Sequence, residues 1–224
     1  MTGNPARILV WDWAIRLVHW LMVVLVPLLW WTAEEGHMEW HKSFGLTMFG
    51  LILFRLLWGL IGTWTARFGP MIRRIGSLPS YIAKLRAGGY RPTFGHSPLG
   101  VLSVFALLLA LTVQITTGLF SVDVDGLESG PLAVLVSFDT GRQLAEVHEF
   151  NFNLLAALIG LHITAIAVYH FVLKANLVGP MITGRRSRVD FAATALPENR
   201  MRFFPMIGAA VLSLICVIAL LNFG

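Results

Sequence analysis

The sequence predicts an all-α integral membrane protein, a four-helix bundle with an additional fifth transmembrane helix at its C-terminal end. Hydrophobic residues make up 56% of the 224 positions and charged residues only 13%, whereas about a quarter of a soluble domain is charged. Five segments reach the roughly 20 apolar residues that a helix needs to cross a bilayer. No unit of 20–50 residues recurs, which favours a bundle over a repeat array.

The five predicted spans cover residues 14–33, 41–62, 99–120, 146–173 and 204–222. In the first, an apolar run follows Arg7 and Arg16, as it would in a signal peptide. It is long, contains His19 and lacks a small-residue cleavage site, so we interpret it as a retained helix.

The third and fifth spans contain no histidine, and this sets them apart from the others. In the third span, four polar side chains are expected to form hydrogen bonds between helices: Thr112, Gln114, Thr116 and Thr117. The fifth carries no charge either, and we interpret it as a peripheral scaffold or a docking surface. The predicted division is a core at residues 1–186, followed by a cytoplasmic linker and the fifth helix at residues 187–224.

The loops alternate in charge along the chain. Basic residues gather before the first span, between the second and third, and between the fourth and fifth. The other two loops hold nine acidic residues against Lys42 and Arg142. The positive-inside rule then predicts a multi-pass membrane protein with its N-terminus in the cytoplasm and its C-terminus outside.

The two faces predict different partners. The basic inner loops set the topology and touch anionic lipid head groups of the bilayer. The outer face has a net charge of about −7, which favours an encounter with an oppositely charged partner, one with a basic face. No nucleic-acid partner is expected.

Four of the seven histidines fall at two matched depths. His148 and His162 are fourteen residues apart, a rise of about 21 Å that leaves both rings on roughly one helix face. His41 lies at the outer level with His148, and His19 at the inner level with His162. The spacing therefore predicts an outer pair and an inner pair.

Two opposed imidazoles at one depth suit the axial positions of a haem iron. Zinc would need four ligands, and neither level offers a cysteine or carboxylate cluster. The single cysteine, Cys216, allows no internal disulfide, and no C-x-x-C-H stretch is present for covalent haem attachment. A packed or hydrogen-bonded role is the alternative for each histidine taken singly. It is the expected role of His37, His96 and His170.

Three further residues are candidates for the cofactor's surroundings. Gly45 lies one turn after His41, where a flat macrocycle could approach the backbone, although close helix packing explains a glycine equally well. Arg55 lies fourteen residues after His41, at the inner level. It could pair with a haem propionate or extend to the cytoplasmic interface. Arg16, one turn before His19, is a second candidate for a propionate.

With these residues in view, the chain resembles the bacterial cytochrome b561 family, which includes the cytochrome b subunits of membrane-bound nickel–iron hydrogenases. The resemblance covers most of the first 186 residues and rests on six stretches: VWDWAIRLVHW (10–20), HKSFG (41–45), RLLWGLIG (55–62), GHSPLG (95–100), HEFNFNLLAALIGLH (148–162) and NLVGPMITGRR (176–186). It implies two b-type haems, with His41 and His148 as outer ligands and His19 and His162 as inner ones. A departure is Gly179-Pro180, where the family pattern is more polar or basic.

The resemblance also implies a location in the bacterial inner membrane, with the C-terminus in the periplasm, and a function. Family members pass electrons between a periplasmic redox partner, such as a c-type cytochrome or a hydrogenase-like complex, and the membrane quinone pool. An electron-transfer subunit is therefore predicted rather than a self-sufficient enzyme. The alternative is a stand-alone quinone-linked oxidoreductase that oxidises quinol or superoxide, although a negative outer face would repel the superoxide anion. The broken helices or inverted repeats of a transporter are not seen.

Overall fold

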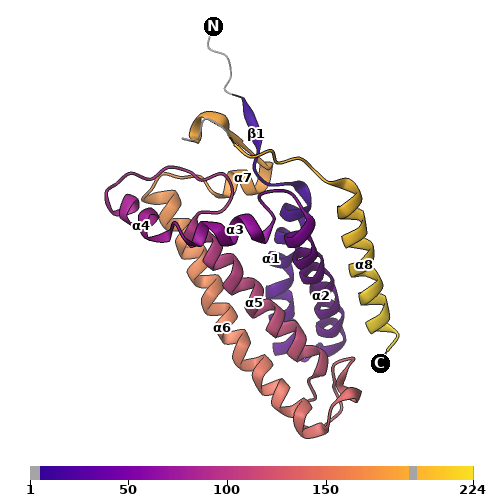
Figure 1. Cartoon of the computed structure of the whole chain (residues 1–224). Coiled ribbons are helices and arrows are strands. Elements are labelled where there is room, and N and C mark those ends of the chain that lie inside the picture. The colour runs from indigo at the N-terminus through magenta and orange to yellow at the C-terminus, as the bar shows by residue number, and fades with distance from the viewer. Residues whose placement is uncertain (1–5, 192–195, 224) are drawn as a thin grey trace. The chain divides into compact units, whose positions relative to one another are not determined.

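The computed structural model describes residues 6–191 and 196–223; residues 1–5 of the predicted core, and residues 192–195 and 224 of the C-terminal part, lie outside that description. The regular structure of the described residues is mostly helix, with two short strands (Figure 1). Five helices are long and apolar enough to cross a membrane: α1 (Trp13–Glu34), α2 (Met38–Ile61), α5 (Pro98–Phe120), α6 (Phe138–Phe171) and α8 (Phe203–Leu221). The predicted all-α membrane fold and its five spans are therefore confirmed.

Helix α6 begins eight residues before the predicted fourth span. Its first turns are polar, so an apolar pattern cannot detect them. The backbone N–H of Thr140 donates to the Ser137 hydroxyl oxygen at 3.2 Å, which caps the start of the helix. Asp139 lies in the first turn, where the helix dipole favours a negative charge. The helix therefore extends beyond its apolar part.

Several short helices and strands outside the five long helices were not predicted. Three short helices lie in the connections: α3 (Phe68–Ile75), α4 (Leu78–Arg86) and α7 (Val178–Thr183). Strand β1 (Arg7–Leu9) pairs antiparallel with β2 (Arg185–Ser187), with Ile8 opposite Arg186. Three-residue strands carry too few positions for an alternating pattern to be read in the sequence.

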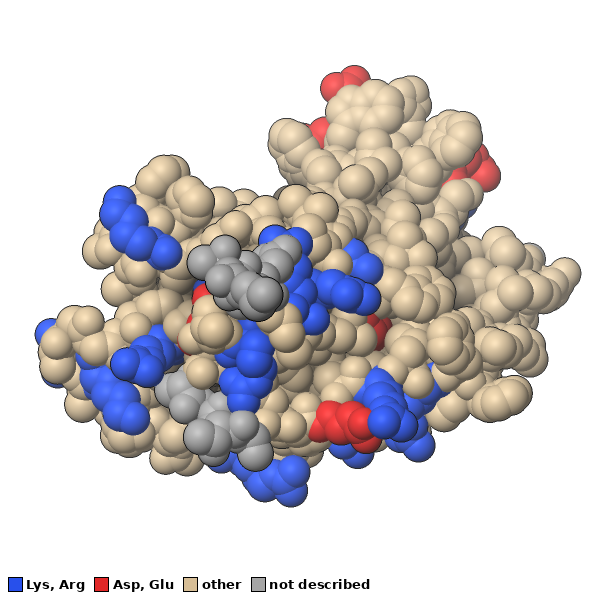
Figure 2. All heavy atoms as spheres, turned by 90° about the horizontal axis from the view of Figure 1, so that it is seen from above, with Lys and Arg blue, Asp and Glu red and all other residues tan. Residues whose placement is uncertain are grey.

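The chain forms two compact units that interleave along the sequence. We call residues 1–17, 57–105 and 160–206 the basic unit, because it holds fourteen Lys and Arg against three Asp and Glu, a net charge of +11. We call residues 18–56, 106–159 and 207–224 the acidic unit, because it holds three Lys and Arg against nine Asp and Glu, a net charge of −6. Figure 2 shows Lys and Arg gathered on the face seen from above. The predicted boundary at residue 186 separates the four-helix core from the linker and the fifth helix. It is not one of the boundaries of these two units, and it stays a prediction.

A buried carboxylate fixes the start of α1 within the basic unit. Asp12 is 1% exposed. Its Oδ1 accepts the backbone N–H of Ile15 at 2.9 Å, as an N-cap does, and its Oδ2 accepts from Trp58 Nε1 at 3.1 Å and Thr63 Oγ1 at 2.6 Å. The start of α1 is therefore tied to the end of α2.

In the acidic unit the helices contact one another through small and polar residues. The Asn151 side chain on α6 donates to the Ala110 carbonyl at 2.9 Å and to Gln114 Oε1 at 2.7 Å, both on α5. A β-carbon on Gly50 of α2 would lie 3.0 Å from Val217 on α8, so the fifth helix packs closely here. Close approach over small residues is typical of membrane helices.

Candidate metal centre

His41 on α2 and His148 on α6 face each other in the acidic unit. Their ring centroids are 6.2 Å apart and their planes are inclined at 74°. Two metal–nitrogen bonds of about 2 Å, with about 1 Å from each nitrogen to its ring centre, span about 6 Å. The separation therefore fits two axial imidazoles with one iron between them.

The second ring nitrogen of each histidine contacts a backbone carbonyl. His41 Nδ1 lies 2.9 Å from the Leu29 oxygen on α1, and His148 Nδ1 lies 2.8 Å from the Gln114 oxygen on α5. A carbonyl oxygen only accepts, so each Nδ1 carries the proton and donates it. Each Nε2 then keeps the lone pair that a metal binds, and the carbonyl fixes the orientation of the ring.

Glycine on α5 makes room for the His148 ring. A β-carbon on Gly118 would lie 2.8 Å from His148 Cε1, which no real contact allows. Thr117 Oγ1 lies 3.3 Å from Nδ1 of the same ring. On α2, a β-carbon on Gly45 would meet nothing within 4 Å. That open space is compatible with a flat group beside Gly45, although no contact assigns the role.

We expect Gly118→Ala to displace the His148 ring and so to weaken the binding of a cofactor between His41 and His148. Overpacking a tight site costs about 1–3 kcal/mol. The matched variant is Gly160→Ala on α6, whose β-carbon has open space; it should be neutral or slightly stabilising, because alanine favours a helix by about 0.5–1 kcal/mol. Cofactor content and thermal stability of the two purified variants measure the difference. Equal cofactor contents would contradict the steric role of Gly118.

The two inner histidines, His19 and His162, lie in different units and have different neighbours. His162 on α6, in the basic unit, has Nδ1 3.2 Å from the hydroxyl oxygen of Ser103 on α5. A hydroxyl can donate or accept, so this contact leaves the tautomer of His162 open. His19 on α1, in the acidic unit, packs edge-on against Trp20 with ring centroids 5.2 Å apart. Their pairing stays a prediction from helix spacing.

The two candidate arginines have different environments. Arg55, in the acidic unit, is only 6% exposed, which fits a partner inside the protein better than extension to an interface. Arg16, in the basic unit, donates from Nη1 to the Ile182 carbonyl and packs over Gly184, where the backbone has φ 78°. This contact attaches α1 to the end of α7, in the stretch where Gly179-Pro180 departs from the family pattern.

We expect Arg55→Leu to lower the midpoint potential of an inner haem. If Arg55 pairs with a propionate, its loss removes a positive charge that favours the reduced iron. A tenfold change in the redox equilibrium corresponds to about 60 mV for one electron. Arg55→Lys keeps the charge and should shift the potential less. Redox titration measures both, and potentials that stay at the wild-type values in Arg55→Leu would reject the pairing.

The other three histidines have aromatic neighbours. His37 is near Trp31 at 5.6 Å, His96 near Trp11 at 4.5 Å and His170 near Phe171 at 4.8 Å, all between ring centroids. No group of three or more metal-ligating side chains is found among residues 6–191 and 196–223. The packed role predicted for these three histidines is consistent with these contacts.

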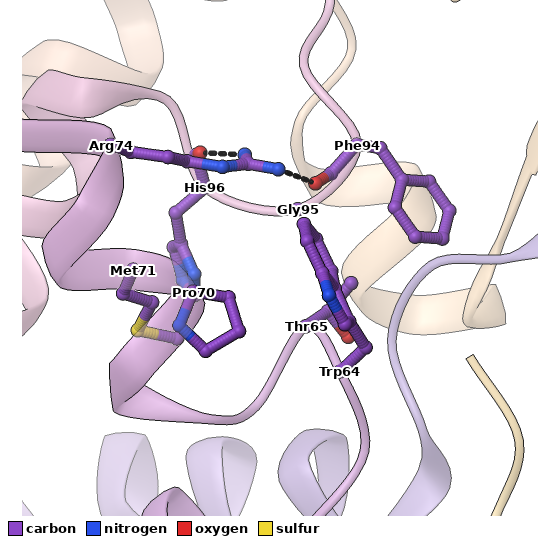
Figure 3. Close-up of a pocket in the computed structure, with 8 residues that line it drawn as sticks. All are labelled: Trp64, Thr65, Pro70, Met71, Arg74, Phe94, Gly95 and His96. Atoms are coloured by element: carbon purple, nitrogen blue, oxygen red, sulfur yellow. Dashed lines mark hydrogen bonds between the residues drawn. The ribbon is translucent and has the colours of Figure 1, made fainter. Parts of the chain in front are cut away.

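A small cavity in the basic unit is lined by residues that hold a loop in place, so we assign it a structural role and not a binding role. Figure 3 shows Arg74 donating to the carbonyls of His96 and Phe94, at 2.5 and 2.6 Å. The guanidinium also lies 5.2 Å from the centre of the Trp64 ring. The cavity holds about one water molecule at most. Arg74 therefore fixes the loop that leads into α5 and so supports the helix that carries Ser103.

The three tyrosines of the chain meet in the basic unit. Tyr81 and Tyr169 share a hydrogen bond of 2.6 Å between their hydroxyls, and the rings of Tyr90 and Tyr169 are 5.5 Å apart. Burial, and then the hydrogen bond to Tyr169, raise the pKa of Tyr81. Burial also raises the pKa of Tyr90. The two phenols stay protonated at neutral pH, and the cluster attaches α4 to the end of α6.

Five acidic residues close to the outer pair in sequence are exposed: Glu34, Glu35, Glu39, Glu146 and Glu149. The two outer loops also hold Lys42 and Arg142. Lys42 pairs with Glu128 at 2.8 Å and with Glu39 at 3.6 Å, and Arg142 donates to the Val122 carbonyl. Two cations offset at most two of the nine acidic charges of these loops, so their net charge remains negative.

Sequence reasoning identified the histidines and missed the groups that orient them. Gln114 and Thr117 were expected to bond between helices, and their carbonyl and hydroxyl contact His148. Thr112 instead bonds to Leu108 in its own helix. Ser103 and Gly118 gave no signal, because neither residue type is unusual in a membrane helix.

A sequence model of the family described as prokaryotic cytochrome b561 matches residues 10–184. The match runs from just before α1 to the end of α7 and includes His19, His41, His148 and His162. None of the curated proteins or solved structures searched matches the chain. Because the family match covers well over half of the sequence, the chain belongs to the prokaryotic cytochrome b561 family.

Proposed function

We propose that this protein relays electrons through two b-type haems between a redox protein at the outer membrane face and the quinone pool. Family membership makes it a membrane protein that binds haem b and transfers electrons. The number of haems, their ligands, the outer partner and the quinone link are the proposal. The core is assigned to residues 1–186, with α8 as scaffold or docking helix.

The separation between His41 and His148 is the observation that carries the proposal. Ring centres 6.2 Å apart leave room for one iron, and carbonyl oxygens hold both rings with Nε2 available. A bound haem supplies one-electron chemistry at that position. Gly45 gives the macrocycle space beside α2, and Gly118 lets α5 approach the back of the ligand.

The second haem is assigned to His19 and His162. Helix α6 is continuous from His148 to His162, so the two rings are separated by about 21 Å of helix rise. The level of His19 follows from its place in α1. Arg55 and Arg16 are assigned to propionates, with the burial of Arg55 in favour. Protein ligands on both sides of each iron leave no open position for a substrate, which supports a relay.

The charges support the partner and the orientation. The loops before α1, between α2 and α5 and between α6 and α8 are basic, which fits the cytoplasmic side of the inner membrane, and the other two loops are acidic, which fits the periplasmic side. This puts the N-terminus in the cytoplasm and the C-terminus in the periplasm. An outer partner with a basic face, such as a c-type cytochrome or a hydrogenase-like complex, complements the exposed glutamates. No contact locates the quinone.

The deciding experiment is haem quantification with a reduced-minus-oxidised spectrum of the purified protein. We expect about two haems per chain, both reducible and both low-spin, as two histidine ligands require. One haem per chain would reject the second site. Rapid turnover of quinol or superoxide without any partner would favour the stand-alone oxidoreductase over the relay.

A further inference from the structure

We propose that the loop between α5 and α6, residues 121–137, forms with Phe138 the docking surface for the outer redox protein, and that this partner presents an apolar contact surrounded by basic side chains. The inference rests on the proposed function and names the contact surface that this function requires. All of these residues lie in the acidic unit. Exposed glutamates attract a partner from a distance, whereas this loop has the features of a direct contact.

Backbone hydrogen bonds fix the loop to the end of α5. The N–H of Gly130 donates to the Ser121 carbonyl at 2.8 Å, and the N–H of Leu132 donates to the Leu119 carbonyl at 2.9 Å. An antiparallel bridge closes the tip of the loop, residues 122–129. A surface held in this way loses little conformational freedom when a partner binds, which favours binding.

The tip exposes apolar side chains. Val124 is 72% exposed and Leu127 is 84% exposed. Between them the chain turns at Gly126, which has φ 71°. A β-carbon on Gly126 would lie 3.5 Å from the ring of Phe138, which is itself 53% exposed, so this ring continues the apolar surface beside the turn. Exposed apolar side chains grouped in this way indicate an interaction site.

The charges near the tip are mainly negative. Four carboxylates belong to the tip or adjoin Phe138: Asp123, Asp125, Glu128 and Asp139. Lys42 pairs with Glu128 at 2.8 Å, and Arg142 donates to the Val122 carbonyl at 3.1 Å. Four acids against these two bases leave a net charge of −2 (2 − 4). A protein with an apolar centre and a basic rim complements this arrangement.

The same charges favour a protein over lipid as the occupant. Anionic lipid head groups attract Lys and Arg and repel carboxylates. Asp125 lies between Val124 and Leu127 in the chain and is exposed. Insertion of the two aliphatic side chains into a bilayer would carry this carboxylate out of water, which is costly for an unpaired charge. A basic protein surface would instead stabilise it.

The loop also packs close to the outer histidine pair. A β-carbon on Gly130 would overlap the carbonyl oxygen of Gly118, and a β-carbon on Gly118 would lie 2.8 Å from His148 Cε1. Gly118 therefore packs against both the loop and the His148 ring. A partner on this surface lies near the proposed axial ligand, where one electron can pass between the two irons without transfer of a proton.

The first test measures binding to haem-loaded protein in lipid nanodiscs, with a purified basic c-type cytochrome as the probe. The double variant Val124→Ser, Leu127→Ser keeps all charges, so its haem spectrum should equal that of the wild type. Binding should weaken about 10- to 100-fold, because burial of one leucine side chain contributes a factor of this order. The control is Ile72→Ser, at an exposed apolar position of α3 in the basic unit, which should bind like the wild type.

A spin label reports the contact without relying on electron transfer. Cys216 is the single cysteine of the chain, so Leu127→Cys in a Cys216→Ala background provides one labelling site. Ala87→Cys provides a control at an exposed position of the basic unit. We expect the label at position 127 to be mobile and accessible to water in nanodiscs, and to lose mobility when the cytochrome is added. The label at position 87 should not respond.

Three results would overturn the inference. A label at position 127 that is shielded from water before any cytochrome is added would assign the tip to lipid. A label that stays mobile with the cytochrome bound, or wild-type binding by the double serine variant, would place the contact elsewhere. Failure of the proposed function looks different, because the wild type itself would then contain no haem or exchange no electrons with the cytochrome.

Discussion

We expect the replacement of His41 or His148 with alanine to lower the haem content from about two per chain to about one. If the proposed ligands are right, the outer haem is lost because its iron lacks one axial ligand, and the inner haem remains. His19→Ala and His162→Ala should remove the inner haem in the same way. Haem quantification and the reduced-minus-oxidised spectrum of each purified variant measure the loss.

Two matched controls test the specificity of this result. His37→Ala and His170→Ala remove histidines that have aromatic neighbours and no assigned iron. Their haem content should equal that of the wild type. If all four ligand variants retained two haems, the assignment would be wrong. Loss of haem in the control variants would point to general misfolding.

Reversing the charges of Glu39, Glu146 and Glu149 to lysine slows electron exchange with a basic c-type cytochrome by about 10- to 1000-fold at low salt. Electrostatic steering changes association rates over this range. The side chains are exposed, and the one described ion pair among them, Glu39 with Lys42, is worth at most about 1 kcal/mol, so both haem spectra should stay intact. Stopped-flow absorbance measures the exchange.

Salt provides the second measure of docking. At physiological ionic strength, the attraction between exposed charges is largely screened beyond about 8 Å. The wild-type exchange rate should therefore fall steeply as the salt concentration rises. The rate of the triple variant should depend only weakly on salt. The control is Arg73→Glu on α3, a reversal of an exposed charge in the basic unit. It should leave the rate unchanged. A wild-type rate that is independent of both salt and the three reversals excludes electrostatic docking.

The spans and the outer histidine pair could be predicted because each depends on a simple repeat. Apolar length identifies a transmembrane helix, and helix rise gives the depth of His41 and His148 before any contact is known. The polar start of α6 could not be predicted in this way, because it is stabilised by the Ser137 cap and not by burial in lipid.

The groups that orient the histidines were beyond sequence reasoning for another reason. The acceptors of His41 and His148 are main-chain carbonyls, which every residue possesses, so no residue type marks them. Ser103 became a candidate only when the pairing of α5 with α6 was known. Helix α5 thus has no histidine of its own and contacts two of the three histidines of α6, His148 and His162.

The pairing of β1 with β2 also sets an order of events during synthesis. Residues 7–9 leave the ribosome about 180 residues before their partners at 185–187, a delay of roughly ten to forty seconds at ordinary elongation rates. By then all four candidate ligands have been made. The N-terminal strand can therefore pair only on a chain that already contains its full set of histidines, and a nascent chain that stops short of residue 185 has no partner for residues 7–9.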